Sequence, residues 1–177
     1  MKTVATLSSA ALALALSFAL PHAAFAKDET PPATKTCSSG KVLDKATNKC
    51  VRTSSNEIND DERYEAVREY AYFGDYTGAL SILASFENQT DPRMFNYYGF
   101  INRKQGNMDA AMEYYAKALT INPDYILARA YMGQGLAAEG DLAGARAQLA
   151  EIRTRGGRNT WAYTSLAMAL RGVQTNY

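Results

Sequence analysis

Histidine and cysteine are scarce in this chain of 177 residues, which limits the chemistry it can perform. The single histidine, His22, lies in an N-terminal segment that we expect to be removed, so the commonest general base and zinc ligand would be missing. Nucleophile-elbow, P-loop, metalloprotease and EF-hand motifs are also lacking. We therefore expect a protein that is not an enzyme and that uses no metal or cofactor.

Long apolar runs are lacking outside the N-terminus. Lys2 precedes an apolar stretch at Ala10–Leu20, and Ala24-Phe25-Ala26 matches a small-residue cleavage site. These features predict a signal peptide, residues 1–26, cleaved between Ala26 and Lys27. No later apolar run reaches the roughly 18 residues that suggest a membrane span. We expect an exported protein without a transmembrane segment, periplasmic or, as the alternative, secreted.

A large excess of either charge is lacking as well. The chain has 19 lysine and arginine residues against 18 aspartate and glutamate residues, and loss of Lys2 makes these numbers equal. Such a balance argues against a nucleic-acid partner. The charge is unevenly placed, since Asp60–Asp91 has eight acidic and two basic residues and Tyr125–Tyr177 has three acidic and six basic. This asymmetry is compatible with a head-to-tail homo-oligomer.

The two cysteines, Cys37 and Cys50, are an even pair, which in an oxidising compartment predicts a disulfide. The enclosed residues favour two short strands around a polar turn, giving a stapled hairpin. A redox-active pair is the alternative, but the C-x-x-C spacing typical of that chemistry is missing. Polar and proline-containing neighbours, including Pro31-Pro32, indicate that residues 27–58 form a flexible tether that carries the hairpin.

A repeat dominates the rest of the chain. Glycine-led turns at Gly74-Asp75, Gly106-Asn107 and Gly140-Asp141 recur at steps of 32 and 34 residues. The positions that keep the same steps are Ala79, Ala111 and Ala145, then Leu83, Tyr115 and Leu149, and then Phe86, Ala118 and Ile152. A period of this length indicates stacked copies of one supersecondary unit.

Local signals in the middle unit favour a pair of helices. Asp91-Pro92 is typical of a helix start, and Gly106 is typical of a left-handed helix end. Between them, apolar residues recur every three to four positions, and a second helix is predicted from Met108 to Thr120. The unit is therefore helix, tight turn, helix.

The middle unit resembles the tetratricopeptide repeat, and the residues that carry the resemblance are Phe95, Gly99, Ala111, Tyr115, Ala118 and Pro123. The resemblance implies an all-α superhelix, or solenoid, with helix pairs at about 60–91, 92–125 and 126–157 in a domain spanning 59–177. A stripe containing Trp161 and Leu166 predicts a further helix at about 159–171 that caps the array. The alternative is an incomplete fourth repeat that another molecule completes.

The resemblance also implies that the first helix of each pair lines a concave, peptide-binding wall. The residues that it places there are Tyr64, Arg68, Tyr72, Arg93, Asn96, Phe100, Arg103, Lys104, Leu127, Gln134 and Ala138. Aromatic and guanidinium groups are enriched in binding hot spots, and the four cations favour an acidic or carboxylate-terminated peptide. The alternative is that the rings pack between helices and the cations form a solvated face.

We therefore expect a non-catalytic adaptor or scaffold that binds a peptide or helix of another cell-envelope protein. Two alternatives remain. The tyrosine-rich wall is also suited to stacking on sugar rings, which would give a polysaccharide-binding accessory protein. Self-assembly alone is the other.

Overall fold

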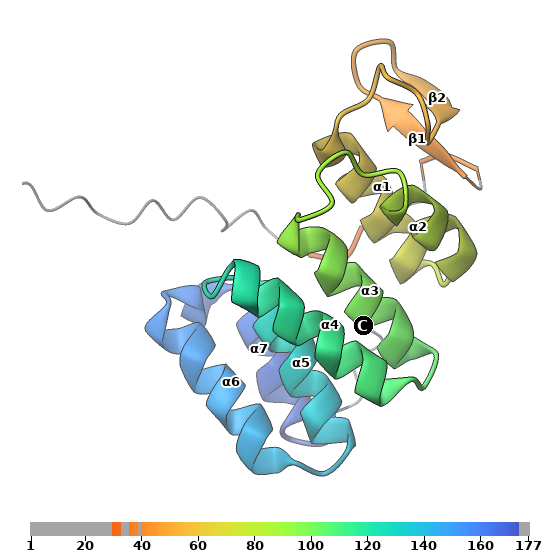
Figure 1. Ribbon diagram of the computed structural model, residues 1–177. Helices are drawn as coiled ribbons and strands as arrows, with labels where there is room; N and C mark the ends of the chain where they lie inside the picture. Colours follow the sequence, from red (N-terminus) through yellow and green to blue (C-terminus); the bar gives the residue numbers. More distant parts are fainter. Residues whose placement is uncertain (1–29, 33–35, 39, 174–177) are drawn as a thin grey trace, which may run out of the picture.

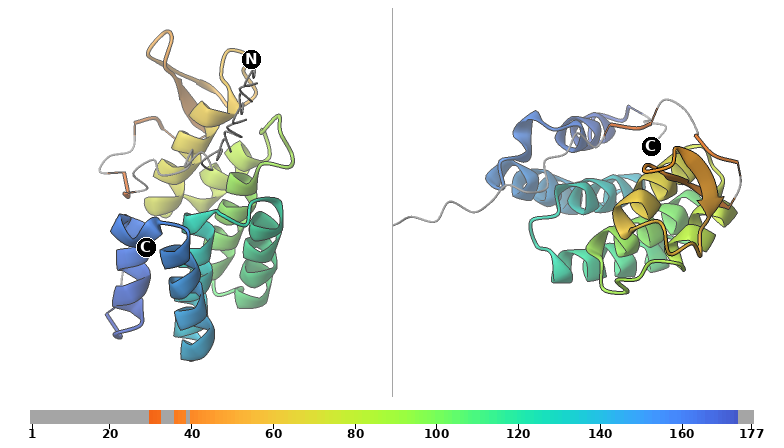
Figure 2. Two further views of the ribbon diagram at one scale, coloured as in Figure 1. Left: turned by 90° about the vertical axis from the view of Figure 1, so that its left-hand side faces the viewer. Right: turned by 90° about the horizontal axis from the view of Figure 1, so that it is seen from above.

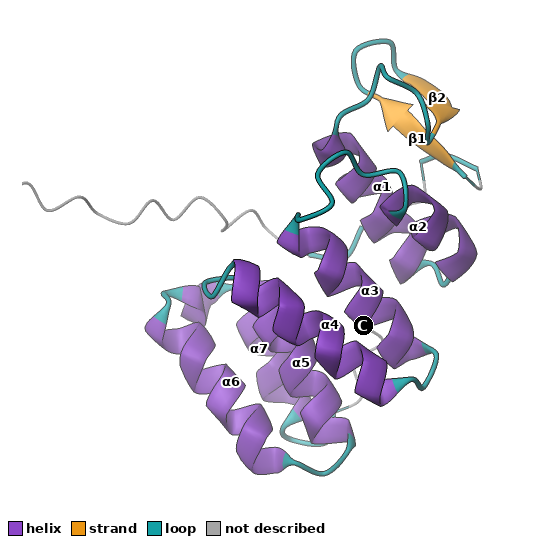
Figure 3. Cartoon of the chain, in the orientation of Figure 1, coloured by secondary structure: helices purple, strands orange, loops and turns teal. Residues whose placement is uncertain are grey.

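The computed structural model describes residues 30–32, 36–38 and 40–173, whose regular secondary structure is helical apart from one small hairpin (Figure 3). The elements in chain order are β1 (Lys41–Asp44), β2 (Lys49–Arg52), α1 (Asp60–Tyr72), α2 (Tyr76–Leu83), α3 (Pro92–Lys104), α4 (Met108–Ile121), α5 (Ile126–Ala138), α6 (Leu142–Thr154), a 3-10 turn (Gly157–Asn159) and α7 (Trp161–Ala169). This confirms the predicted mostly helical chain with an N-terminal hairpin. The predicted signal peptide and its cleavage site at Ala26 and Lys27 lie outside the described residues.

The helices pack in adjacent pairs (Figure 1). The pairs are α1 with α2, α3 with α4, and α5 with α6, while α1, α3, α5 and α7 contact one another in succession. In Figure 1, α4 and α6 lie in front of α5 and α7. We call the side built by α1, α3, α5 and α7 the inner face. The arrangement is consistent with a solenoid, and among the described residues no helix is long and apolar enough to cross a membrane.

The repeated turns have a local cause. Gly74, Gly106 and Gly140 have φ values of 76°, 84° and 87°, a conformation that side chains with a Cβ rarely adopt. The next residue in the first and third turns is an aspartate that caps the following helix. Asp75 Oδ1 accepts from the amide of Gly78 at 3.0 Å, and Asp141 Oδ1 from that of Gly144 at 2.8 Å. Each turn thus ends one helix and starts the next.

Small and large residues alternate where paired helices meet. Ala79, Ala111 and Ala145 are completely buried, and so is the ring of Tyr115 on α4. A Cβ on Gly99 of α3 would lie 2.6 Å from that ring, which explains the glycine. The recurring glycine and alanines therefore set how closely the helices approach.

The hairpin is attached to α1. Its strands are antiparallel, and a disulfide joins Cys37 to Cys50, which confirms that prediction. Val42 on β1 is completely buried in the core. Lys41 N donates to the Tyr70 hydroxyl oxygen at 3.2 Å, and Tyr70 donates to Lys41 O at 3.0 Å. The hairpin thus shields part of the first helix from solvent.

Carboxylates on α1 complete this attachment. Glu62 accepts from Lys45 N at 2.9 Å, and Glu69 accepts from both Thr36 N and Thr36 Oγ1, at 2.7 and 2.9 Å. Glu62 also forms the capping box of α1 with Asn59. Part of the segment that we predicted to be a tether is therefore hydrogen-bonded along the first helix.

The last helix, α7, lies within the predicted range of about 159–171. Thr160 caps it by accepting from Tyr163 N at 3.2 Å. It packs against α5 and α6, in the row that α1, α3 and α5 begin. Its position is that of the first helix of a fourth pair, which fits both a cap and an incomplete repeat.

Candidate functional site: the inner face

A chain of aromatic rings runs across the four helices of the inner face. The ring centroids of Tyr64 and Tyr97 lie 5.7 Å apart, those of Phe100 and Tyr131 5.1 Å, and those of Tyr131 and Trp161 6.3 Å. Tyr97 and Phe100, which are 5.8 Å apart on α3, join the two halves. Offset and edge-to-face pairs of this kind contribute about 0.5–1.5 kcal/mol each beyond the area they bury. The rings therefore form a rigid base beneath the inner face.

Tyr72, at the end of α1, extends this base towards solvent. Its ring meets that of Phe100 edge-on at 5.5 Å, and its hydroxyl is hydrogen-bonded to that of Tyr131. Tyr131 is completely buried, which raises its pKa well above the ordinary value, and Tyr97 and Tyr72 add to the shift. Tyr72 itself is half-buried, so part of its ring faces the surface.

Two cations lie on the same base. The guanidinium carbon of Arg103 lies 5.5 Å from the centroid of Phe100 and 5.7 Å from that of Tyr131, within the range of cation–π attraction. Lys104 Nζ lies 5.8 Å from the Phe100 centroid. Burial lowers the pKa of Lys104, and the neighbouring charge of Arg103 lowers it further. Both side chains are half-buried.

A hydrogen-bonded series fixes Arg103 in place. Its Nη2 donates to Gln134 Oε1 at 3.4 Å, and its Nε donates to the Tyr115 hydroxyl at 3.4 Å. Gln134 Nε2 in turn donates to Ser165 Oγ on α7 at 3.0 Å. The series links α3, α4, α5 and α7, so the Arg103 guanidinium is hydrogen-bonded to two neighbouring helices.

The cations at the other end of the inner face are ion-paired. Arg93 lies over the Tyr64 ring at 4.8 Å and pairs with Asp91 at 2.7 Å and Asp61 at 2.6 Å. Burial alone would lower the pKa of Arg93, but its hydrogen bonds to the two aspartates raise it above the ordinary value. Arg68 pairs with Glu65 at 2.9 Å. Positive charge is therefore partly neutralised at this end.

The structure divides the predicted wall residues by burial. Those that are buried are Tyr64, Asn96, Phe100, Leu127 and Gln134. Those that are half-buried are Arg68, Tyr72, Arg93, Arg103 and Lys104, whereas Ala138 is exposed. The half-buried group retains surface area that a partner can contact, and the buried group supports it.

Sequence reasoning missed several residues of this face. Tyr97, Tyr131, Trp161 and Ser165 all belong to it, through the ring contacts and hydrogen bonds described above. One signal was present, because Tyr97 and Tyr131 are separated by the same 34-residue step as Gly99 and Gly133. From here on, the inner-face site means the half-buried Arg68, Tyr72, Arg103, Lys104 and Trp161.

A cavity of about 50 Å³ lies between the hairpin and α1, lined by Glu62, Glu65, Glu69 and Tyr70 among others. This is room for a few water molecules. Among residues 30–32, 36–38 and 40–173, no group of three histidine, cysteine, aspartate or glutamate side chains is arranged to hold a metal ion.

Comparison with known families agrees with this geometry. A family model described as tetratricopeptide repeat matches residues 103–167, which run from the end of α3 through α4, α5 and α6 into α7. The match supports a tetratricopeptide-repeat family. Comparisons with curated proteins and with solved structures gave no match. Tetratricopeptide repeats generally mediate protein–protein interactions, which is consistent with an adaptor role.

Proposed function

We propose that this protein is a non-catalytic adaptor or scaffold that binds a peptide or helix of another protein on its inner face. The observation that carries the proposal is the inner-face site itself, in which half-buried aromatic and cationic side chains from α1, α3 and α7 lie on one continuous base of buried rings. Tyrosine, tryptophan and arginine are the residues most enriched in binding hot spots.

The chemistry of the site favours a partner segment that carries carboxylates. Arg103 is held in position by Gln134 and Tyr115, so binding an anion costs little reorganisation. Lys104 adds a second positive charge beside it. A guanidinium binds a carboxylate through two parallel hydrogen bonds, which gives direction as well as affinity.

The compartment that we propose is the periplasm or cell envelope, with secretion as the alternative. The N-terminal sequence supports export, and the Cys37–Cys50 disulfide supports an oxidising environment. Fractionation of the cells that produce the protein tests this assignment, because recovery with cytoplasmic proteins, with residues 1–26 retained, would contradict it.

Charge reversal at one lysine tests the site. Lys104 and Lys117 both lie over an aromatic ring, Lys104 over Phe100 on the inner face and Lys117 over Tyr114 on α4. We expect Lys104→Glu to reduce capture of crosslinked partners from the native cells by at least about tenfold, and Lys117→Glu to leave it unchanged. Equal capture by both variants and the wild type would refute this site.

Self-association is a second candidate, favoured by charge placement and exposed apolar side chains. The stretch Asp60–Asp91 is acidic and the stretch Tyr125–Tyr177 is basic, and Met168 and Val173 near the C-terminal end are 37% and 45% exposed. Head-to-tail contact would bring these ends together. A molar mass in solution that falls as salt is added would support it, whereas a monomer mass at low and high salt would exclude it.

A further inference from the structure

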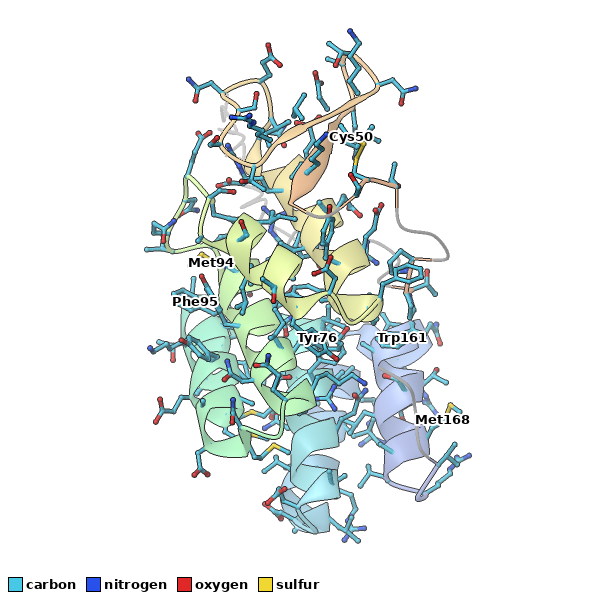
Figure 4. The ribbon with its side chains drawn as sticks, turned by 90° about the vertical axis from the view of Figure 1, so that its right-hand side faces the viewer. Cys50, Tyr76, Met94, Phe95, Trp161 and Met168 are labelled. Carbon is cyan, nitrogen blue, oxygen red and sulfur yellow. A yellow bond between two sulfur atoms is a disulfide. The ribbon has the colours of Figure 1, made fainter. Side chains whose placement is uncertain are left out.

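A segment from before the hairpin lies against the inner face. Arg68 Nη2 on α1 donates to the main-chain carbonyl of Thr30 at 2.7 Å, although the two residues are 38 positions apart. Pro31 and Pro32 are half-buried. Both views in Figure 2 show residues 30–32, in orange-red, passing beside the amino end of α7. Figure 4 places Trp161 at that end of α7.

The local chemistry explains this contact. Arg68 is oriented by its ion pair with Glu65 and lies 5.8 Å from the Tyr64 ring, so its remaining donors point in a fixed direction. A Pro-Pro pair has no amide donors of its own and favours an extended backbone with outward carbonyl groups. A positioned guanidinium and an extended proline segment are therefore complementary.

We propose that Thr30–Pro32 is an intramolecular occupant of the inner-face site, which a partner must displace. The same contacts define the partner as an extended, proline-containing peptide segment that offers a main-chain carbonyl to Arg68. This inference rests on the proposed adaptor function and adds to it the backbone chemistry of the partner and a competitor within the chain.

The short connection to the hairpin makes such competition effective. Thr36 is hydrogen-bonded to Glu69, and Cys37 is joined by the disulfide to Cys50, so only residues 33–35 separate two attached segments. A short tether gives an effective concentration of the order of mM. Thr30–Pro32, which we call the cis segment, therefore needs only weak intrinsic affinity for the inner-face site to lower the apparent affinity of a partner for that site by about tenfold.

The test uses the purified chain and a fluorescent synthetic peptide with the sequence of Lys27–Thr36 as the probe. Its affinity is measured by anisotropy, with protein concentrations extending to mM. In the variant P31G/P32G the cis segment loses its preference for the extended form, and we expect the probe to bind about tenfold more tightly than to the wild type. Adding R68A should remove this binding, whereas adding R153A, at an exposed arginine of α6, should not.

Two results would overturn the inference. They are equal affinity for the wild type and P31G/P32G, and no binding to P31G/P32G at mM concentration. Circular dichroism and urea unfolding establish that each variant is folded, and P31G/P32G changes residues outside every helix and strand. Capture of a partner that depends on Lys104 but not on Pro31 and Pro32 would leave the adaptor function standing while removing the cis occupant.

Discussion

Arg129 on α5 donates two hydrogen bonds to the carbonyl oxygen of Pro123, from Nε at 3.0 Å and from Nη2 at 2.6 Å. Arg155, just after α6, donates to the same oxygen at 2.9 Å. Pro123 lies in the loop between the second and third helix pairs, so the two arginines join these pairs. Arg129 lies 34 residues after Phe95, at the position where tetratricopeptide repeats have an aromatic residue. In the third helix pair a charged side chain therefore takes the place of an apolar one.

Removal of the Arg129 side chain should cost stability. The Arg129 side chain is 11% exposed, and Arg129→Ala would leave the Pro123 carbonyl with fewer donors, so we expect the free energy of unfolding to fall by about 2–3 kcal/mol. Arg155→Ala, at a side chain that is 25% exposed, should cost less. Urea unfolding measures both. A larger loss of unfolding free energy for Arg155→Ala than for Arg129→Ala would show that Arg129 is not the main link between the two helix pairs.

Two helical glycines should respond differently to alanine. A Cβ on Gly99 would lie 2.6 Å from the confined Tyr115 ring and 3.1 Å from the carbonyl oxygen of Ala111, so Gly99→Ala should destabilise by about 1–2 kcal/mol. On Gly135 the Cβ would meet the mobile end of Met112, which can shift. Gly135→Ala should therefore be neutral or stabilising by up to about 1 kcal/mol, through helix propensity. Chemical denaturation measures the free energy of unfolding of both variants. Equal effects of Gly99→Ala and Gly135→Ala would contradict the close packing of Gly99 against the Tyr115 ring.

Asp60 should contribute stability that acid removes. Burial alone would raise its pKa, but hydrogen bonds from the amides of Asn88 and Glu87 and from Arg63 outweigh burial and lower it below 3.8. A lowered carboxyl pKa gives stability that is present above the unfolded-state value and is lost as the pH falls through the folded-state value. We expect Asp60→Asn to cost about 1–3 kcal/mol at neutral pH and progressively less below about pH 4.

Urea unfolding of Asp60→Asn and the wild type across the acid range checks this, with Glu113→Gln, at an exposed carboxylate of α4, as the control. If the loss of unfolding free energy caused by Asp60→Asn stays constant from neutral pH into the acid range, the Asp60 carboxylate does not provide the stability that acid removes.

The buried tyrosines should make the fold sensitive to alkali. Burial raises the pKa of Tyr115 above the ordinary 10.0 and that of Tyr131 well above it. A raised pKa gives stability that is present below the unfolded-state value and is lost as the pH rises above it. The free energy of unfolding should fall above about pH 10, by about 1.4 kcal/mol per pH unit for each such tyrosine.

Tyr131→Phe tests the alkaline effect. It should reduce the fall of the unfolding free energy above about pH 10 by about 1.4 kcal/mol per pH unit, the contribution of one tyrosine. Stability measured near pH 8 separates the slope from the loss of the Tyr72 hydrogen bond. An unchanged slope would mean that Tyr131 ionises in the folded state.

The helix array could be predicted from sequence because its signals are local. Positive φ at Gly74, Gly106 and Gly140 favours glycine, and the aspartates that follow two of them cap helices through contacts within three residues. These requirements repeat with the structural unit and therefore appear as a period. The Cys37–Cys50 pair was equally readable, because no third cysteine competes.

Local sequence signals could not predict which side chains of the inner face are buried. Whether Phe100 faces a partner or the core depends on Tyr131, a residue of another helix pair, and on how closely α3 and α5 approach. The attachment of the hairpin likewise depends on Tyr70 and Glu69, about 30 positions from their partners. Contacts between distant segments have no periodic sequence signature.

Site-specific photocrosslinking in the native cells is the sharpest test of partner binding at the inner face. A photoreactive phenylalanine derivative, which keeps an aromatic ring, replaces Tyr72 on the inner face in one sample and Tyr114 on α4 in the other, and the products are identified by mass spectrometry. We expect a discrete partner protein crosslinked from position 72, through one of its extended segments, and none from position 114. The same products from both positions, or none from either, would contradict partner binding at the inner face.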